Sequence, residues 1–417
     1  MKRLLLLEVK RIARVRSTQV LALIALILSI VMASLVVSFE RYYYIDENGN
    51  EAHLNGIAAI RANRERFHNI EGALTPEKIR EVFEIYHEVC AKYGTEPSDL
   101  PNNVYIERII PIEPILYGIW QAYVDEETGV PIPMYTITPD MAADFYKKRT
   151  DRLSSFLSYK YENAPSVLGN ALALNQTVKT PFNYTYGCTF RNVADYLTMY
   201  IFLLAMICAI ITAPVFSGGY QSGADEILRC TKNGRWKLSL AKSLSSMLVA
   251  VTIYSICTFI FILITYTAIG WNRFDTSMQI AYSAISFAPL DVGDVNLLII
   301  LCGLLSLLAM ICFTLFISAV FSKPSTSLTI ALGTCSLPLI LYIMGSNSTV
   351  ATWIRLCLPS GGLGFSNSFF YELCDFNFLP FGSAYIWTPY IIPVASLVEI
   401  ILFLLLTKRS YVKHEIS

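Results

Sequence analysis

Long apolar stretches separated by polar segments are the main pattern along this chain. A helix needs about 20 predominantly apolar residues to cross the hydrocarbon core of a bilayer. Six stretches have about this length, and they cover approximately residues 18–39, 196–216, 243–268, 296–320, 326–345 and 386–407. The first contains no charged residue and is too long for the core of a signal peptide. The pattern therefore predicts six transmembrane helices.

The fifth and sixth stretches contain residues that are unusual in a membrane span. Pro338 interrupts the fifth, whereas Pro389, Pro393 and Glu399 interrupt the sixth. Proline is tolerated in spans because neighbouring helices can satisfy the freed carbonyl groups. An intramembrane carboxylate is costly, so Glu399 is a candidate functional residue. For Glu399 we favour a structural polar contact over a role with a substrate or a proton.

The distribution of basic residues predicts the orientation of these helices. Fifteen Lys and Arg residues lie in the N-terminal segment, between spans two and three, between spans four and five, and after the last span. The short loops on the opposite side carry only Arg273 and Arg355. Basic residues accumulate in cytoplasmic loops. We therefore expect both termini to be cytoplasmic in a multi-pass protein of the cell membrane, most simply a bacterial plasma membrane.

Charge divides the chain into an acidic segment and a basic remainder. Residues 40–195 hold 15 basic and 22 acidic side chains, and the other residues hold 17 and 10. Hydrophobic residues make up 54% of the chain and charged residues 15%, against about 25% charged in soluble domains. These values exclude a simple soluble enzyme, a secreted disulfide scaffold and a protein that binds nucleic acid through a basic face. The segment 40–195 is predicted to be an extracellular domain.

The remaining organisation follows from this division. Residues 1–17 form a predicted cytoplasmic helix, residues 18–39 the first span, and residues 196–417 the other five spans. In the N-terminal helix the apolar residues Leu5, Leu6, Val9, Ile12 and Ala13 share one face, and the cations Arg3, Lys10 and Arg14 lie on another. This pattern is typical of a helix that lies in the membrane interface. A basic anchor alone would give the same charges, and the two interpretations are compatible.

The predicted extracellular domain contains two clear helix starts. Thr75-Pro76-Glu77 combines an N-cap, a first-turn proline and an acid, and Gly94 is a plausible stop. Thr138-Pro139-Asp140 has the same pattern. Residues 97–133 contain six prolines and are expected to be irregular and partly extended. The domain is therefore predicted to be mostly helical, and the whole chain mainly α.

Candidate chemistry is sparse. On the predicted outer side, Cys90 and Cys188 lie in the domain and Cys357 and Cys374 in the last loop, so each pair permits one disulfide whose connectivity the sequence does not fix. His87 and Cys90 have a spacing compatible with a metal, but no second pair accompanies them. The chain contains no Gly-x-x-x-x-Gly-Lys-Ser/Thr phosphate loop. We expect no catalytic residue, metal or cofactor on this chain.

The predicted cytoplasmic connection between spans two and three, residues 217–242, is the most informative segment. It combines a short amphipathic helix, a glycine break and basic residues that lead into the next span. We expect Ile227 and Leu228 to be buried, and Asp225, Glu226 and Arg229 to remain available to a partner. Such an element suits force transfer from a cytosolic subunit. The alternative is an ordinary amphipathic loop with positive-inside residues.

This segment resembles the permease subunits of the ABC type 2 exporter family. The matching residues are Phe216, Gly223-Ala224, Ile227-Leu228, Gly234-Arg235 and Ala241-Lys242, in order and spacing. Gly219 departs from the pattern, because the family usually has a glutamate there. The N-terminal helix and Leu358-Pro359 after span five are also similar to the family.

The resemblance implies a permease that forms a translocation pathway as a homodimer or heterodimer and is driven by a separate cytosolic ABC ATPase, which binds the ATP. It assigns the contact with that ATPase to Gly223, Asp225, Glu226, Ile227, Leu228, Arg229, Gly234 and Arg235. The alternative hypotheses are a membrane-anchored receptor or sensor whose extracellular domain binds a ligand, and a membrane enzyme. Five further spans argue against the first, and the lack of a recognisable catalytic set argues against the second. The sequence does not indicate the transported substrate.

Overall fold

The structure is a computed structural model that describes residues 1–94, 99–125, 129–187, 190–231, 234–345, 348–365 and 367–414. The chain forms two compact units, each built from segments that are distant in sequence. Unit 1 comprises Met1–Ala33, Ala194–Ile264 and Leu297–Ser417. Unit 2 comprises Ser34–Val193 and Thr265–Asn296.

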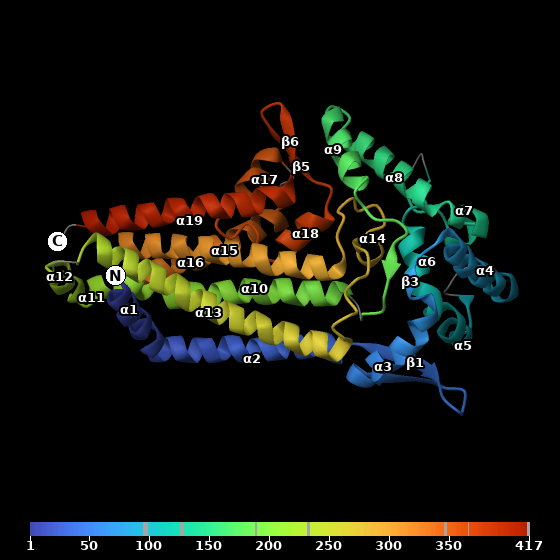
Figure 1. Cartoon of the computed structure of the whole chain (residues 1–417), viewed down its shortest axis with the longest axis horizontal. Coiled ribbons are helices and arrows are strands. Elements are labelled where there is room, and N and C mark those ends of the chain that lie inside the picture. Colours follow the sequence, from blue (N-terminus) through green and yellow to red (C-terminus); the bar gives the residue numbers. More distant parts are fainter. Residues whose placement is uncertain are drawn as a thin grey trace. The chain divides into compact units, whose positions relative to one another are not determined.

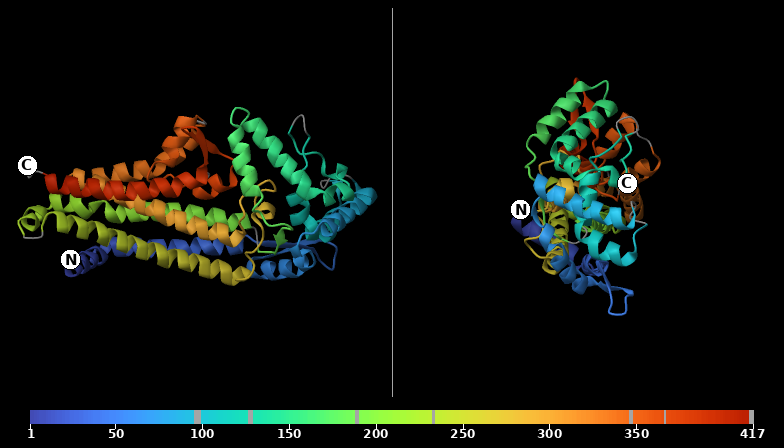
Figure 2. Two further views of the ribbon diagram at one scale, coloured as in Figure 1. Left: turned by 45° about the horizontal axis from the view of Figure 1, so that its top comes forward. Right: turned by 90° about the vertical axis from the view of Figure 1, so that its right-hand side faces the viewer.

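Long apolar helices form the body of unit 1. In the described part of the chain, six helices are long and apolar enough to cross a membrane, which confirms the predicted number. They are α2 (Arg16–Ser38), α10 (Phe190–Thr212) with its continuation α11 (Pro214–Gln221), α13 (Trp236–Ile269), α15 (Val292–Val320), α16 (Pro324–Ile343) and α19 (Thr388–Lys413). They run side by side through unit 1 in both views (Figures 1 and 2).

The amphipathic N-terminal segment forms helix α1 (Lys2–Arg14). Its buried positions are Glu8 and Ile12, whereas Leu6, expected on the apolar face, is exposed. The face of α1 that packs against the protein is therefore a different one from the apolar face predicted to contact the membrane. The N-terminus and the C-terminus lie at the same end of unit 1 (Figures 1 and 2), as an even number of crossings requires.

Unit 2 is mainly helical, with two small antiparallel sheets. One sheet pairs β1 (Arg41–Ile45) with β2 (Glu51–Asn55), with Tyr43 opposite His53, and the other pairs β3 (Gly72–Ala73) with β4 (Asn183–Tyr184). Its helices include α3 (Gly56–Phe67), α4 (Pro76–Tyr93), α7 (Pro139–Ala143), α8 (Phe145–Lys160), α9 (Pro165–Asn175) and α14 (Met278–Ala281).

Both predicted helix starts in unit 2 are confirmed. The hydroxyl of Thr75 accepts a hydrogen bond from the amide of Lys78 and so caps α4, which ends at Gly94 with φ +145°. The hydroxyl of Thr138 caps α7 in the same way, accepting from the amide of Met141 at 3.2 Å. These side chains satisfy amides that have no partner in the first turn of a helix.

The expectation of irregular structure over residues 97–133 is wrong for most of the described part. Residues 102–120 form α5 (Asn102–Val104), a π-helical segment (Tyr105–Ile109), a 3-10 turn (Ile110–Ile112) and α6 (Glu113–Trp120). Pro101 is the N-cap of α5, and Pro114 lies in the first turn of α6. Proline favours a helix start because its missing amide hydrogen is not needed there. The number of prolines therefore did not predict irregular structure, because these prolines lie at helix starts. Residues 95–98 and 126–128 lie outside the described residues.

Three arginines tie residues 265–296 to the rest of unit 2. Arg64 donates to the carbonyl oxygen of Ile269 at 2.5 Å, Arg149 donates to that of Ala284 at 2.6 Å, and Arg273 forms an ion pair with Glu71. Burial lowers the pKa of Arg149 to about 10. The predicted domain of residues 40–195 did not include this second segment.

The disulfide that the sequence permits between Cys357 and Cys374 is not formed in the structure. Cys357 is an exposed free thiol that follows α17 (Thr349–Leu356), and Cys374 ends α18 (Phe369–Cys374). A buried ion pair between Arg355 and Glu372 joins these two helices instead. Cys90 is buried in α4, and its predicted partner Cys188 lies outside the described residues, so that bridge stays a prediction.

Candidate functional site

The candidate site is at the end of unit 1 where α10 breaks and α11 begins. Pro214 has no amide hydrogen, and the amides of Phe216 and Ser217 lie in the first turn of α11. Both donate to the hydroxyl of Ser318 in α15 at 3.1 Å, and that hydroxyl donates to the carbonyl oxygen of Ala213 at 2.6 Å. The side chain of Ser318, from another helix, thus caps the N-terminus of α11 and fixes its direction.

Two glycines then shape the segment around α12 (Ala224–Arg229). Gly223 precedes α12 with φ +69°, a left-handed conformation that glycine adopts without steric cost. Gly234 serves a different purpose, because a Cβ atom at this position would lie 1.8 Å from the carbonyl oxygen of Leu228. The chain can return this closely past the end of α12 only with glycine at 234.

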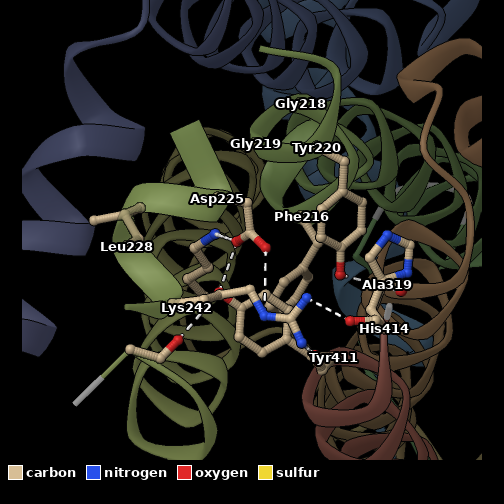
Figure 3. Close-up of polar contacts among 12 residues, drawn as sticks. Phe216, Gly218, Gly219, Tyr220, Asp225, Leu228, Lys242, Ala319, Tyr411 and His414 are labelled. Atoms are coloured by element: carbon tan, nitrogen blue, oxygen red, sulfur yellow. Dashed lines mark hydrogen bonds and ion pairs between the residues drawn. The ribbon is translucent and has the colours of Figure 1, made fainter. Parts of the chain in front are cut away.

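Asp225 lies at the centre of a buried ionic cluster, which we call the Asp225 cluster and define as Asp225, Arg229, Lys242 and Tyr411 (Figure 3). The carboxylate of Asp225 is only 3% exposed. Its Oδ1 atom accepts a 2.7 Å hydrogen bond from the Tyr411 hydroxyl and lies 3.8 Å from Nζ of Lys242. Its Oδ2 atom lies 3.8 Å from Nε of Arg229. The cluster thus compensates a charge that would be costly to bury alone.

Arg229 attaches α12 to the C-terminal end of α19. Its Nη1 atom donates to the carbonyl oxygen of His414 at 2.6 Å, and its Nη2 atom donates to those of Tyr411 at 2.8 Å and Val412 at 3.2 Å. The last carbonyls of a helix lack partners within the helix, and a cation at this end is favoured by the helix dipole. Arg229 therefore satisfies the end of α19 while it contacts Asp225.

Lys242 places a positive charge inside unit 1. It lies near the start of α13 and is 0% exposed. Its Nζ atom is 5.2 Å from the ring centroid of Phe216 and 5.4 Å from that of Tyr411, so both rings stabilise the ammonium group. Among the described residues Nζ has no hydrogen-bond acceptor, since 3.8 Å to Asp225 is too long for a hydrogen bond. Asp225 is thus its closest countercharge.

The N-terminal helix α1 adds a second ion pair to this region. Arg11 lies 2.8 Å from the buried carboxylate of Glu8, and the charges of both residues act on Lys242. Glu8 lies on the face of α1 that packs against the protein. A residue of α1 therefore shares the electrostatic environment of the Asp225 cluster.

Aromatic rings enclose the cluster. The Tyr220 ring stacks on His414 with centroids 4.0 Å apart, and its hydroxyl donates to the carbonyl oxygen of Ala319 at 3.2 Å (Figure 3). The ring of Tyr411 lies 5.2 Å from that of Phe216. Side chains of α11, α12, α13 and α19 and the end of α15 therefore meet at one point.

The burial expected for α12 is wrong. Asp225 and Arg229 point into unit 1, whereas Ile227 is 75% exposed and Leu228 is half-buried. Asp225 and Arg229 are four residues apart, so they share a helix face, and the charge of Lys242 draws that face inward. Glu226 and Arg235 are exposed, as expected.

Sequence reasoning missed three members of this site. Lys242 was identified as a basic flanking residue and as part of the Ala241-Lys242 match, but not as a buried charge, although its place in an apolar stretch is a signal that it needs a buried countercharge. Glu8 is the lone acid of α1, one helical turn from Ile12, and that spacing could have indicated a buried position. Tyr411 carried no signal, because its partner is far away in the sequence.

Glu399 does not belong to the Asp225 cluster. It lies on the buried face of α19 together with Ser396 and Thr407, and it is 8% exposed. Its Oε2 atom has no hydrogen-bond partner within the described part of the chain. The structural polar contact that we favoured for Glu399 is therefore not seen at this atom.

The comparison with protein families decides the identity. A family model described as "ABC-2 family transporter protein" matches residues 7–353. The chain belongs to the ABC-2 transporter family. The match covers unit 2 and five of the six candidate span helices, and it ends before α19. A comparison with the curated proteins finds no match.

Family membership confirms the resemblance drawn from the sequence. This ABC-2 transporter protein is a multi-pass membrane component of an ABC transporter, of a family that typically lacks its own ATPase domain. Its Asp225 cluster connects the matched region to α19, which lies beyond the match.

Proposed function

We propose that this ABC-2 transporter protein is the membrane-spanning permease subunit of an ATP-driven exporter. It forms the translocation pathway as a dimer with a second copy or a related permease, and a separate cytosolic ABC ATPase binds the ATP and drives it. Both termini and residues 217–242 lie in the cytoplasm. Because the chain belongs to a family of transporter components, a transport function is favoured over that of a receptor that only binds a ligand.

The observation that carries the proposal is the two-sided character of α12. Its outer face presents Glu226 and the apolar side chain of Ile227. Its inner face holds Asp225 and Arg229 against Lys242 and the end of α19. A helix of six residues is not stable on its own, so these ionic contacts hold α12 in place. A displacement of α12 by a docked ATPase would therefore be passed to α13 and α19.

The position of Gly219 supports the same role. Similar permeases usually have a glutamate here, and a Cβ atom at Gly219 would lie 3.7 Å from Nζ of Lys242 and 3.6 Å from Cβ of Asp225. A carboxylate at position 219 or at position 225 would therefore reach Lys242. In this chain Asp225 supplies the negative charge that the usual glutamate would bring.

Co-purification with an ABC ATPase of the same organism, co-expressed with the permease, tests the proposal. Ile227→Asp and Glu226→Arg change only the exposed face of α12, so we expect both to lower the amount of ATPase retained without lowering the yield of folded permease. Ile57→Asp is the matched control, because Ile57 is an exposed apolar residue of unit 2. Retention that is unchanged in both α12 variants, or equally reduced in the control, would contradict the contact.

Labelling of intact cells with a membrane-impermeant maleimide tests the orientation. Thr231→Cys and Asn103→Cys both place a thiol at an exposed position, in a chain whose exposed native cysteines have been replaced. We expect Asn103→Cys to react and Thr231→Cys to react only after lysis. The opposite pattern would overturn the cytoplasmic location of the loop.

A further inference from the structure

Unit 2 contains a cavity of about 700 Å³. This volume is within the range of about 300–1,000 Å³ that small-molecule sites have. Its wall is formed by β1, β2, α3, the helical segments over residues 102–117, the region of β4, and residues 276–281. All of these segments belong to unit 2. The cavity is thus a property of this unit and is separate from the Asp225 cluster.

The wall of the cavity is rich in aromatic side chains. Five tyrosines line it, namely Tyr43, Tyr105, Tyr117, Tyr184 and Tyr186. Phe67 also lines it and stacks on Tyr186 with ring centroids 5.1 Å apart. Aromatic rings present negative faces to a ligand and offer flat apolar contact area. The cavity therefore suits a ligand with an apolar or planar body.

The two cationic residues in the wall are already engaged. The guanidinium of Arg66 donates to the backbone oxygen of Tyr43 and lies 3.9 Å from the ring centroid of Tyr42. Arg41 is exposed, and its Nη1 atom donates to the Tyr43 hydroxyl at 3.2 Å. Neither guanidinium is therefore an open site for an anionic ligand.

Each carboxylate in the wall accepts a hydrogen bond from a neutral donor. The hydroxyl of Tyr186 donates to Glu40 at 2.6 Å, and the amide of Asn102 donates to Glu51 at 3.2 Å. Glu113 accepts a 3.0 Å hydrogen bond from the Tyr105 hydroxyl. Within the described part of the chain, no Lys, Arg or His side chain forms an ion pair with Glu113. Burial raises the pKa of Glu113, and the hydrogen bond from Tyr105 opposes this shift only in part.

We propose that this cavity binds an organic cation, with its ammonium or guanidinium group between the carboxylate of Glu113 and the rings of Tyr105 and Tyr117, and its apolar body against Tyr184 and Tyr186. A cation would supply the countercharge that Glu113 lacks, and the ring faces add cation–π attraction. Both guanidiniums in the wall are already engaged, so the wall offers an anion of the same size no open cationic partner among the described residues.

Binding of ethidium, a planar organic cation, tests this proposal. The full-length protein in nanodiscs of zwitterionic lipid is titrated with ethidium, and empty nanodiscs provide the blank. We expect saturable binding that Glu113→Gln weakens at least about tenfold, because the variant keeps the shape of the side chain and loses its charge. Glu107→Gln is the matched control, because Glu107 is an exposed acid on the neighbouring turn that does not line the cavity, and it should bind like the parent.

A second variant tests the site without changing Glu113, so that a folding defect of Glu113→Gln cannot by itself account for the result. Tyr117→Leu keeps Glu113 and removes one ring, so we expect it to weaken ethidium several-fold. Fluorescein, a planar anion, should not displace ethidium from the parent protein. Absence of saturable binding, equal affinities of the parent and Glu113→Gln, or an equal loss in Glu107→Gln would overturn the proposal.

Discussion

The hydroxyl of Tyr411 donates a 2.7 Å hydrogen bond to Oδ1 of Asp225, which lies 186 residues earlier in the chain. The same carboxylate lies 3.8 Å from Nζ of Lys242 and 3.8 Å from Nε of Arg229. One buried carboxylate therefore joins the short helix α12 to both α13 and α19.

Tyr411→Phe removes the hydroxyl and keeps the ring. We expect it to lower the free energy of unfolding by about 1–3 kcal/mol, because a hydrogen bond to a buried charged acceptor is lost. Unfolding of the purified protein in mixed micelles measures this change. Tyr390→Phe is the control, since Tyr390 lies on the same helix with its side chain exposed. Equal effects of the two variants would show that the bond to Asp225 contributes nothing.

Asp225→Asn leaves the ammonium of Lys242 buried without its closest countercharge. We expect this single change to destabilise the protein by about 3–5 kcal/mol, as removal of one partner of a buried ion pair does. Lys242→Met should restore most of the loss when it is combined with Asp225→Asn, because the uncompensated charge is then gone. The double-mutant cycle measures this coupling. Additive losses would contradict the pairing, and Glu226→Gln, at an exposed site, should change stability by no more than about 0.5 kcal/mol.

Gly234→Ala should disrupt the loop after α12. The added methyl group would lie 1.8 Å from the carbonyl oxygen of Leu228, so the backbone must move. We expect faster proteolysis of residues 222–236 and weaker retention of the ATPase. Gly218→Ala is the matched control, because its Cβ atom would lie at an ordinary 3.6 Å from Pro214. A Gly234→Ala protein that resists proteolysis like the parent would show that the close approach is not required.

Glu113 should make the local stability of unit 2 depend on pH. Burial raises its pKa in the folded protein, so its contribution to stability is fully present below the ordinary value of 4.5 and is lost as the pH rises through the raised pKa. The hydroxyls of Tyr105, Tyr117 and Tyr184, which also line the cavity, have raised pKa values and stay protonated throughout this window.

The other charged side chains in the wall are Glu40, Glu51, Arg41 and Arg66, and Glu113→Gln leaves all of them in place. We expect Glu113→Gln to protect residues 105–120 against hydrogen exchange better than the parent at pH 8, with the difference vanishing below about pH 4.5. Comparison of the two proteins at each pH cancels the intrinsic exchange rates. A difference that is constant with pH would exclude titration of Glu113 as its cause.

Much of the fold could be predicted because its signals are local. Length and hydropathy predict the six helices, and Thr75 and Thr138 mark helix starts through contacts three residues away. The composition of residues 97–133 misled the prediction, since Pro101 and Pro114 begin helices instead of breaking them.

The candidate site was only partly predictable for a physical reason. The segment around α12 could be found from its glycines and its amphipathic pattern, but the direction of its faces depends on Lys242 and Tyr411. These contacts span up to 186 residues, and a single sequence carries no signal for such pairing. The second segment of unit 2, residues 265–296, was missed for the same reason, because contacts between residues distant in sequence hold it.

The central claim is that the exposed face of α12 is the contact with an ABC ATPase. Photo-cross-linking in cells tests it most directly, with a photoreactive amino acid at position 227 or, as the control, at position 57, followed by mass spectrometry of the cross-linked product. We expect position 227 to capture a protein with a Gly-x-x-x-x-Gly-Lys-Ser/Thr phosphate loop and position 57 not to capture one. Failure of position 227 to capture such a protein, or equal capture from position 57, would exclude the exposed face of α12 as the contact.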